Sequence, residues 1–263
     1  TPFAVISDKA NNRKYPIADY SLTPTVAIVD PALVLTVPGF VAADTGMDVL
    51  THATEAYVSQ MASDYTDGLA LQAIKLVFEN LESSVKNADF HSREKMHNAS
   101  TIAGMAFANA FLGISHSMAH KIGAQFHTIH GRTNAILLPY VIRYNGTRPA
   151  KTATWPKYNY YRADEKYQDI ARMLGLPAST PEEGVESYAK AVYELGERVG
   201  IQMNFKAQGI DEKEWKEHSR ELAFLAYEDQ CSPANPRLPM VDHMQEITED
   251  SYYGYKERPG RRK

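Results

Sequence analysis

The chain is nearly without cysteine, and this absence limits the classes of protein to which it can belong. Cys231 is the single cysteine among 263 residues, so the chain cannot form an internal disulfide. Scaffolds that depend on a disulfide framework are excluded, and a reducing, cytoplasmic location is expected. The chain opens on Thr1-Pro2-Phe3 without a basic segment followed by an apolar one, so no secretory signal is visible.

A strong charge of either sign is absent as well. The chain carries 28 basic and 32 acidic side chains, which leaves a formal net charge of -4. So small a charge creates no field that would gather nucleic acid or an anionic membrane. The longest uncharged apolar stretch, residues 101–118, contains Asn109 and His116, so we interpret it as a core helix. We therefore expect neither a nucleic-acid partner nor a membrane partner.

Apolar residues at three- and four-residue spacing dominate the chain after Pro38-Gly39, and 44% of all residues are hydrophobic. This periodicity predicts amphipathic helices around a buried core. One helix start is marked by Thr180-Pro181-Glu182-Glu183, in which a cap residue precedes a proline and, three positions on, a glutamate. The pattern predicts helices at residues 42–60, 64–82, 92–112, 115–125, 132–145, 163–174, 181–199, 211–227 and 239–252.

Two short β-branched runs precede the helical part. Residues 3–7 and 25–29 predict β-strands, and a polar turn that contains Lys14 lies between them. Two strands alone do not form a stable sheet, whereas the helical part is large enough to fold by itself. We therefore expect further structure before residue 1.

Asp and His residues recur at helical spacing in two of the predicted helical segments. Asp48 and His52 are four positions apart, which places both side chains on one helix face. His116 and His120 repeat this spacing, and His130 follows in a loop. The segment is otherwise apolar, so a polar ring there needs a partner. One carboxylate oxygen with imidazole nitrogens suits a first-row divalent ion, so we predict a metal site with one position open for substrate.

Three longer motifs surround these candidate residues. They are residues 46–56 (GMDVLTHATEA), 113–123 (GISHSMAHKIG) and 130–139 (HGRTNAILLP). They resemble the two signatures of the iron-dependent (group III) alcohol dehydrogenases, and the resemblance covers essentially the whole chain. The stretch 235–254 more narrowly resembles the alcohol dehydrogenase half of bifunctional aldehyde–alcohol dehydrogenases.

The resemblance implies a role for individual residues. By position, the iron ligands of the family fall on Asp48, His52, His116 and His130. A further histidine near the nicotinamide falls on His120, which is then a proton-handling neighbour and not a fifth ligand. Phe107 matches a position that lines the substrate pocket. Lys14 matches a lysine that contacts the cofactor, although a solvated surface lysine explains that position equally well.

The resemblance also implies a fold and a domain organisation. The family binds the dinucleotide pyrophosphate on a glycine-rich turn of an N-terminal α/β domain, but this chain has no Gly-Gly pair and no G-x-G-x-x-G motif. We therefore expect a mainly α chain. Residues 1–37 would be a β remnant of the missing dinucleotide-binding domain, and residues 38–263 would be the all-helical, dehydroquinate synthase-like metal-binding domain. Such a fragment should bind metal and catalyse poorly or not at all alone.

The reaction implied by the resemblance is reversible hydride transfer between NAD and a small primary alcohol, with acetaldehyde and ethanol as the expected pair. Iron(II) would act as a Lewis acid, and the same donor atoms accept zinc. The implied partners are an aldehyde dehydrogenase half on the same polypeptide and further copies of the chain, in an oligomer that can extend to a filament.

Two other functions stay open on the residues alone. A helical metal-dependent hydrolase would use the ion to activate water and would need no dinucleotide. A non-enzymatic module would hold the metal for structure and use its surface for assembly. No activating motif surrounds Cys231, so we expect a buried, inert thiol there and no catalytic role.

Overall fold

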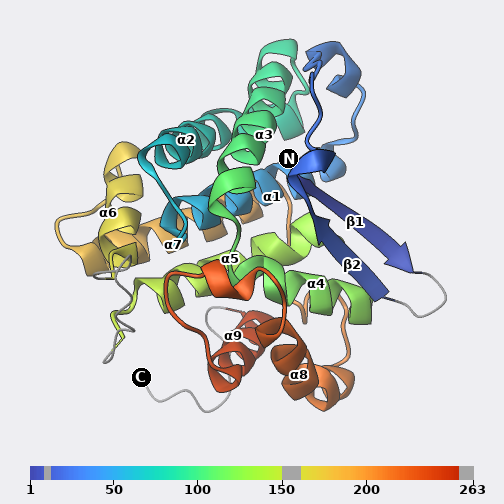
Figure 1. The fold of residues 1–263 in the computed structure, drawn as a ribbon, viewed down its shortest axis with the longest axis vertical. Coiled ribbons are helices and arrows are strands. Elements are labelled where there is room, and N and C mark those ends of the chain that lie inside the picture. The colour runs from blue at the N-terminus through green and yellow to red at the C-terminus, as the bar shows by residue number, and fades with distance from the viewer. Residues whose placement is uncertain (9–12, 150–160, 255–263) are drawn as a thin grey trace.

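The computed structural model describes residues 1–8, 13–149 and 161–254, and helices make up most of these ranges (Figure 1). The expected mainly α fold class is confirmed. All of the helices expected from the apolar spacing occur, with ends that differ by at most four residues from the predicted ones. Their bounds are α1 Gly39–Val58, α2 Asp64–Lys86, α3 Phe90–Ala110, α4 Ile114–Phe126, α5 His130–Gly146, α6 Ala163–Met173, α7 Pro181–Arg198, α8 Glu212–Tyr227 and α9 Val241–Tyr253.

The helix start expected at Thr180 is confirmed by its contacts. The Thr180 side chain accepts a hydrogen bond from the Glu183 backbone N–H, and Pro181 is the first residue of α7. At the start of α2, Ser63 and Thr66 form a reciprocal capping box. These side chains satisfy N–H groups that have no partner within their own helix, which explains why the helices begin at these positions.

The strand prediction was correct for the first run and wrong for the second. Strand β1 (Phe3–Asp8) pairs antiparallel with β2 (Arg13–Ala18), and Phe3 lies opposite Ala18. Residues 25–29 form no strand, and Val26 is 76% exposed. β-branched residues favour a strand only where a neighbouring strand supplies hydrogen bonds, and no described strand pairs with this segment.

Strand β2 escaped prediction because its sequence, RKYPIA, is polar and contains Pro16. A proline is tolerated in a two-stranded ladder, where one side of each strand has no neighbour. Lys14 consequently lies within β2, opposite Ser7, and not in the turn where the sequence placed it. The side chain of Lys14 lies outside the part of the chain that the structure describes.

Two groups of buried side chains form the core, and α5 contributes to both. The first lies among α1, α2, α3, α6 and α7, and the second among α4, α8 and α9. Leu138 of α5 packs in the first group, whereas its neighbour Leu137 packs in the second, around Trp215. Helices α1, α4 and α5 therefore meet where the two groups adjoin, and the metal-ligand candidates lie on these three helices.

A sharp bend joins α3 to α4. The backbone of Phe111, directly after α3, takes a left-handed φ of 61°, and α4 begins at Ile114. No single helix in the described ranges is long and apolar enough to cross a membrane; α3 and α4 reach that length and character only as a pair, bent by 107°. After the bend, the first turn of α4 lies against α1, where the Ser115 N–H donates a hydrogen bond to Glu55.

Candidate metal centre

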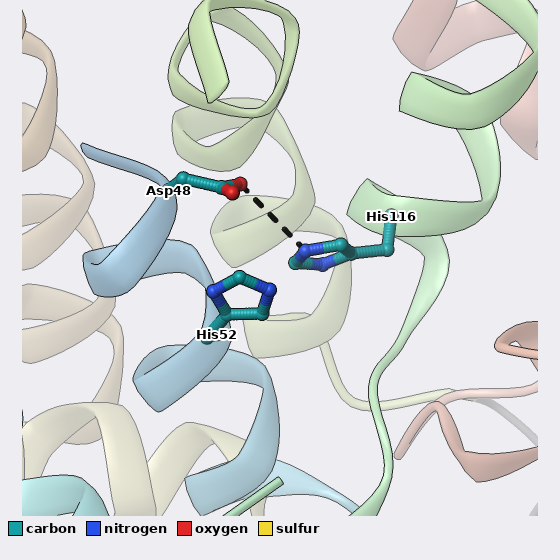
Figure 2. Close-up of side chains that lie close together, drawn as sticks. All are labelled: Asp48, His52 and His116. Atoms are coloured by element: carbon teal, nitrogen blue, oxygen red, sulfur yellow. Dashed lines mark ion pairs between the residues drawn. The ribbon is translucent and has the colours of Figure 1, made fainter. Parts of the chain in front are cut away.

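Three of the predicted ligands converge between α1 and α4. Asp48 and His52 lie one turn apart on α1, and His116 extends toward them from α4 (Figure 2). One oxygen of Asp48 and one nitrogen of each ring all lie within 4.8 Å of one another. The His52 and His116 rings stack with centroids 4.5 Å apart. Donor atoms at these separations suit one cation with ligand bonds of about 2.0–2.2 Å.

His130 approaches the same carboxylate from α5. Its Nε2 atom is 3.7 Å from Asp48 Oδ1, and its ring centroid is 5.4 Å from that of His116. The expectation of a loop position was wrong, because His130 is the first residue of α5. The next residue explains how the helices come so close: a Cβ atom on Gly131 would lie 2.2 Å from the Asp44 carbonyl oxygen. The absence of a side chain at Gly131 therefore lets α5 start against α1.

The two ring nitrogens of His116 have different surroundings. Nδ1 lies 2.6 Å from Glu55 Oε2, whereas Nε2 is buried and has no hydrogen-bond partner among the described residues. Burial lowers the pKa of His116 well below its usual value, and the neighbouring His52 lowers it further. The ring is therefore neutral at neutral pH, and an unsatisfied lone pair in a buried site is costly. A cation at Nε2 would remove that cost.

The Asp48 carboxylate is held as an anion. Burial would raise its pKa, but attraction to His52 and His130 and a hydrogen bond from Asn134 outweigh burial, so the pKa of Asp48 is lowered. Asn134 Nδ2 donates to Asp48 Oδ1 at 2.8 Å. An ionised carboxylate beside three imidazoles is a donor set that first-row divalent ions accept, so these residues fit iron(II) or zinc.

His120 lies at the edge of this group. Its Nδ1 atom is 3.2 Å from Asp229 Oδ2, and its ring stacks on that of His130 with centroids 5.4 Å apart. Lys121 Nζ contacts the same Asp229 oxygen at 2.8 Å. Asp229, which is not among the candidate ligands, thus orients His120. The His120 ring itself lies next to the candidate ligand His130.

Phe107 is also brought to the site. Its ring stacks on that of His52 with centroids 4.6 Å apart. The ring centroid of Phe3, in β1, is 5.7 Å from that of Phe107. Phe107 therefore covers one face of the His52 imidazole with an apolar ring, and Phe3 packs on Phe107. The structure therefore places Phe107 next to the candidate ligands, whereas for Lys14 it gives only the backbone position in β2.

The sequence interpretation missed the residues that support the site. The side chain of Glu55 is 2% exposed. Burial raises its pKa to about 7, although hydrogen bonds from the backbone at the start of α4 act in the opposite direction. Arg132 forms a two-fold contact with the buried Asp44, at 2.9 and 3.0 Å, and so ties α5 to α1. A signal existed in the spacing, because Asp44, Asp48, His52 and Glu55 recur every three or four residues on one face of α1.

Comparisons with known proteins show the family to which this chain belongs. The model of the Fe-containing alcohol dehydrogenase family, C-terminal, matches residues 42–252. The aldehyde-alcohol dehydrogenase of Streptococcus pneumoniae serotype 2 is 98% identical over 263 residues, which are 100% of this chain and 30% of that protein. The bifunctional aldehyde-alcohol dehydrogenase AdhE of Escherichia coli K12 is 44% identical over 259 residues, 97% of this chain and 29% of that protein.

A solved structure agrees with the family match. The sulfoacetaldehyde reductase of Bifidobacterium kashiwanohense, determined in complex with NAD+, superposes with a TM-score of 0.77 at 28% identity over 95% of this chain and 60% of that one. The chain spans about 30% of the length of the Streptococcus pneumoniae and Escherichia coli relatives. Since the family match covers α1 to α9, which hold every candidate ligand, this chain belongs to the Fe-containing alcohol dehydrogenase family and represents its C-terminal region.

Proposed function

We propose that Asp48, His52, His116 and His130 hold one divalent cation, iron(II) or zinc, and that the chain is the metal-binding part of an NAD-dependent alcohol dehydrogenase. The observation that carries the proposal is the buried Nε2 of His116, which has no hydrogen-bond partner among the described residues and lies 3.8 Å from Asp48 Oδ1. A single cation would satisfy both atoms. Membership of the family supports this ligand set.

The bound ion would supply Lewis acidity toward an alcohol or aldehyde oxygen, and NAD would supply the hydride acceptor or donor. The chain's own residues would do the rest. Phe107 would exclude water beside His52, because its ring covers one face of that imidazole. His120, oriented by Asp229, would accept the proton that leaves the alcohol. The N–H of the imidazolium would in turn face the Asp229 carboxylate, which stabilises that charge.

We further propose acetaldehyde and ethanol as the substrate pair. The Phe107 ring lies against the candidate ligand His52 and Phe3 packs on Phe107, and this apolar surface favours a small apolar substrate. The name of the Streptococcus pneumoniae relative, aldehyde-alcohol dehydrogenase, supports this choice. The name of the Escherichia coli relative describes that protein as bifunctional, which supports an aldehyde dehydrogenase partner on the same polypeptide.

The test uses the full-length Streptococcus pneumoniae relative with its matching segment replaced by this chain. We expect NADH oxidation by acetaldehyde only after iron(II) or zinc is restored to the metal-free protein, and no activity in the Asp48→Ala variant. Absence of NADH oxidation in a metal-loaded protein would contradict the proposal and favour the hydrolase alternative.

A structural metal is distinguished by a second measurement. If the ion only stabilises the fold, the His116→Ala variant should lose cooperative thermal unfolding. If the ion is catalytic, that variant should keep its unfolding transition and lose metal and activity together. Circular dichroism during heating decides between these outcomes.

A further inference from the structure

Glu55 lies beneath the candidate metal centre and uses both of its carboxylate oxygens. It is on α1, one turn after His52, and its side chain is buried. Its Oε2 atom is 2.6 Å from His116 Nδ1, and its Oε1 atom accepts the Ser115 backbone N–H at 2.7 Å. Ser115 is in the first turn of α4, where backbone N–H groups have no partner in the helix. The carboxylate thus binds the start of α4 and one of its side chains at once.

We propose that Glu55 is a positioning residue, which holds the His116 ring so that Nε2 points at a divalent cation. The inference rests on the metal-binding function proposed above. An imidazole that binds a cation through one nitrogen keeps its proton on the other, and an acceptor at that second nitrogen sets the tautomer and the ring orientation. Glu55 Oε2 is placed to be this acceptor.

The same buried network extends to the second donor. Ser115 Oγ donates to Asn134 Oδ1 at 3.2 Å, and Asn134 Nδ2 donates to Asp48 Oδ1 at 2.8 Å. Ser115 and Asn134 are both fully buried, so water does not compete for these bonds. Glu55 therefore holds His116 directly, and through Ser115 it is connected to the amide that orients Asp48.

The Glu55→Gln variant tests this role with almost no change in shape. A glutamine has one oxygen and one NH₂ group, and the buried Ser115 N–H requires the oxygen. The NH₂ group must then face His116 Nδ1 and donate to it. That arrangement moves the ring proton to Nε2 and blocks the atom that would bind the cation.

The measurement is zinc affinity of the 263-residue chain, determined by competition with a chromogenic chelator. We expect Glu55→Gln to bind zinc about 10–100-fold more weakly than the parent, the range typical of lost partners of metal-ligating histidines. The matched control is Thr54→Val, at the adjacent position of α1. It removes a buried hydrogen bond to Tyr188, 2.6 Å long, in the core away from the metal ligands, and should leave zinc affinity unchanged.

The outcomes separate the two proposals. If the parent binds zinc and Glu55→Gln binds it within about threefold as tightly, the role of Glu55 is refuted while the metal site stands. If the parent binds no zinc, the metal site itself is refuted, and the role of Glu55 with it.

A second measurement determines the tautomer of His116 in the parent protein itself. Nitrogen-15 NMR of the zinc-loaded parent, with the His116 signals assigned by their loss in His116→Gln, should show a protonated Nδ1 and a metal-bound Nε2. The reverse assignment would overturn the proposal.

Discussion

Two groups of side chains in the described ranges contain enough histidine, carboxylate or thiol to hold a cation, and their polar atoms are satisfied to different degrees. We refer to Asp48, His52 and His116 as the Asp48 cluster, and to His120, Asp229 and Cys231 as the Asp229 cluster. In the Asp229 cluster, the carboxylate already contacts the Lys121 ammonium at 2.8 Å and His120 at 3.2 Å. In the Asp48 cluster, His116 Nε2 is buried, and no described residue forms a hydrogen bond with it. A group of residues that are able to bind a metal is therefore a weaker indication of a metal site than a buried acceptor atom whose hydrogen-bonding capacity is unsatisfied.

The electrostatics of the two clusters differ in the same direction. Burial raises the pKa of the Cys231 thiol well above its usual value, and the Asp229 charge raises it further. Such a thiol stays protonated, and a protonated thiol is a poor ligand. His116, in contrast, is held neutral, with a lone pair ready to bind. The Asp229 cluster is best explained as a satisfied polar group that orients His120.

The largest expected difference between the clusters is in metal content. Asp48→Ala and His130→Ala should each abolish the near-stoichiometric metal that we expect in anaerobically purified protein, because each removes one of four donors. Asp229→Asn and Cys231→Ala should retain it. Elemental analysis of the four variants and the parent is the measurement. Retention of metal by Asp48→Ala, or its loss in Cys231→Ala, would reverse the assignment of the two clusters.

The second effect concerns the close approach of α5, which brings His130 to the Asp48 cluster. In Gly131→Ala, the new Cβ would lie 2.2 Å from the Asp44 carbonyl oxygen and 3.1 Å from Asp48 Cβ, so α5 must move away from α1. We expect the free energy of unfolding to fall by about 1–3 kcal/mol, the range for overpacked interiors, and metal affinity to fall with it. Chemical denaturation and zinc titration measure the two changes.

Gly68→Ala is the matched control for this substitution. Gly68 lies in α2, and a Cβ there would meet nothing within 4 Å. Alanine in a helix interior is more favourable than glycine by about 0.5–1 kcal/mol, so this variant should be slightly more stable with unchanged metal affinity. Equal effects of the two substitutions would show that the approach of α5 is not critical to the site.

The sequence predicted the Asp48 cluster better than it predicted the support around it. Asp48 and His52 are four positions apart in one helix, so helical geometry alone places them on one face. The helices themselves followed from apolar spacing, because burial in a core imposes a periodicity that is visible in the sequence. The convergence of His116 on α1 was a weaker prediction: it came from the gathering of histidines in an otherwise apolar segment, and the family resemblance then separated the ligands from His120. Spacing alone does not determine how two separate helices pack.

The residues that sequence reasoning missed are those whose partners lie far along the chain. Asp229 is 109 positions from His120, and its role depends on how α8 packs on α4. Asn134 reaches Asp48 across 86 positions. The failed strand at residues 25–29 has the same cause, because strand formation depends on a neighbouring strand, which local composition does not reveal. Glu55 is the exception, since its spacing from His52 was visible and was not used.

A smaller effect, on the free energy of unfolding, is expected from the Asp229 carboxylate. Burial would raise the pKa of Asp229, but hydrogen bonds and charges from His120 and Lys121 outweigh it and lower the pKa below its unfolded value of about 4. A lowered carboxyl pKa adds stability above the unfolded pKa, and that stability is lost as pH falls through the folded pKa. Asp229→Asn should therefore unfold more easily by about 1–2 kcal/mol at neutral pH, with a difference that shrinks toward acid.

Denaturant unfolding of the parent and Asp229→Asn, measured at several pH values from neutral to acid, tests this expectation. The exposed pair of Arg220 and Asp242 provides a control, because Asp242→Asn removes a surface contact between side chains that are 62% and 76% exposed. Surface pairs contribute about 0–1 kcal/mol, so the control should show little dependence on pH. A constant difference between parent and Asp229→Asn at all pH values would contradict the buried ion pair.

The smallest effect should come from the thiol of the Asp229 cluster. Cys231 is buried, its backbone N–H donates to Asp229 Oδ1 at 3.1 Å, and burial keeps its thiol protonated by raising the pKa. The native protein should therefore resist iodoacetamide at neutral pH, because alkylation requires an exposed thiolate. Cys231→Ala should change the free energy of unfolding by no more than about 1 kcal/mol, since the hydrogen bond belongs to the backbone and survives the substitution. Mass spectrometry of the alkylated native and unfolded protein measures the reactivity. Rapid labelling of the native protein would show that the thiol is ionised and available, and the Asp229 cluster would then have to be reconsidered as a second cation site.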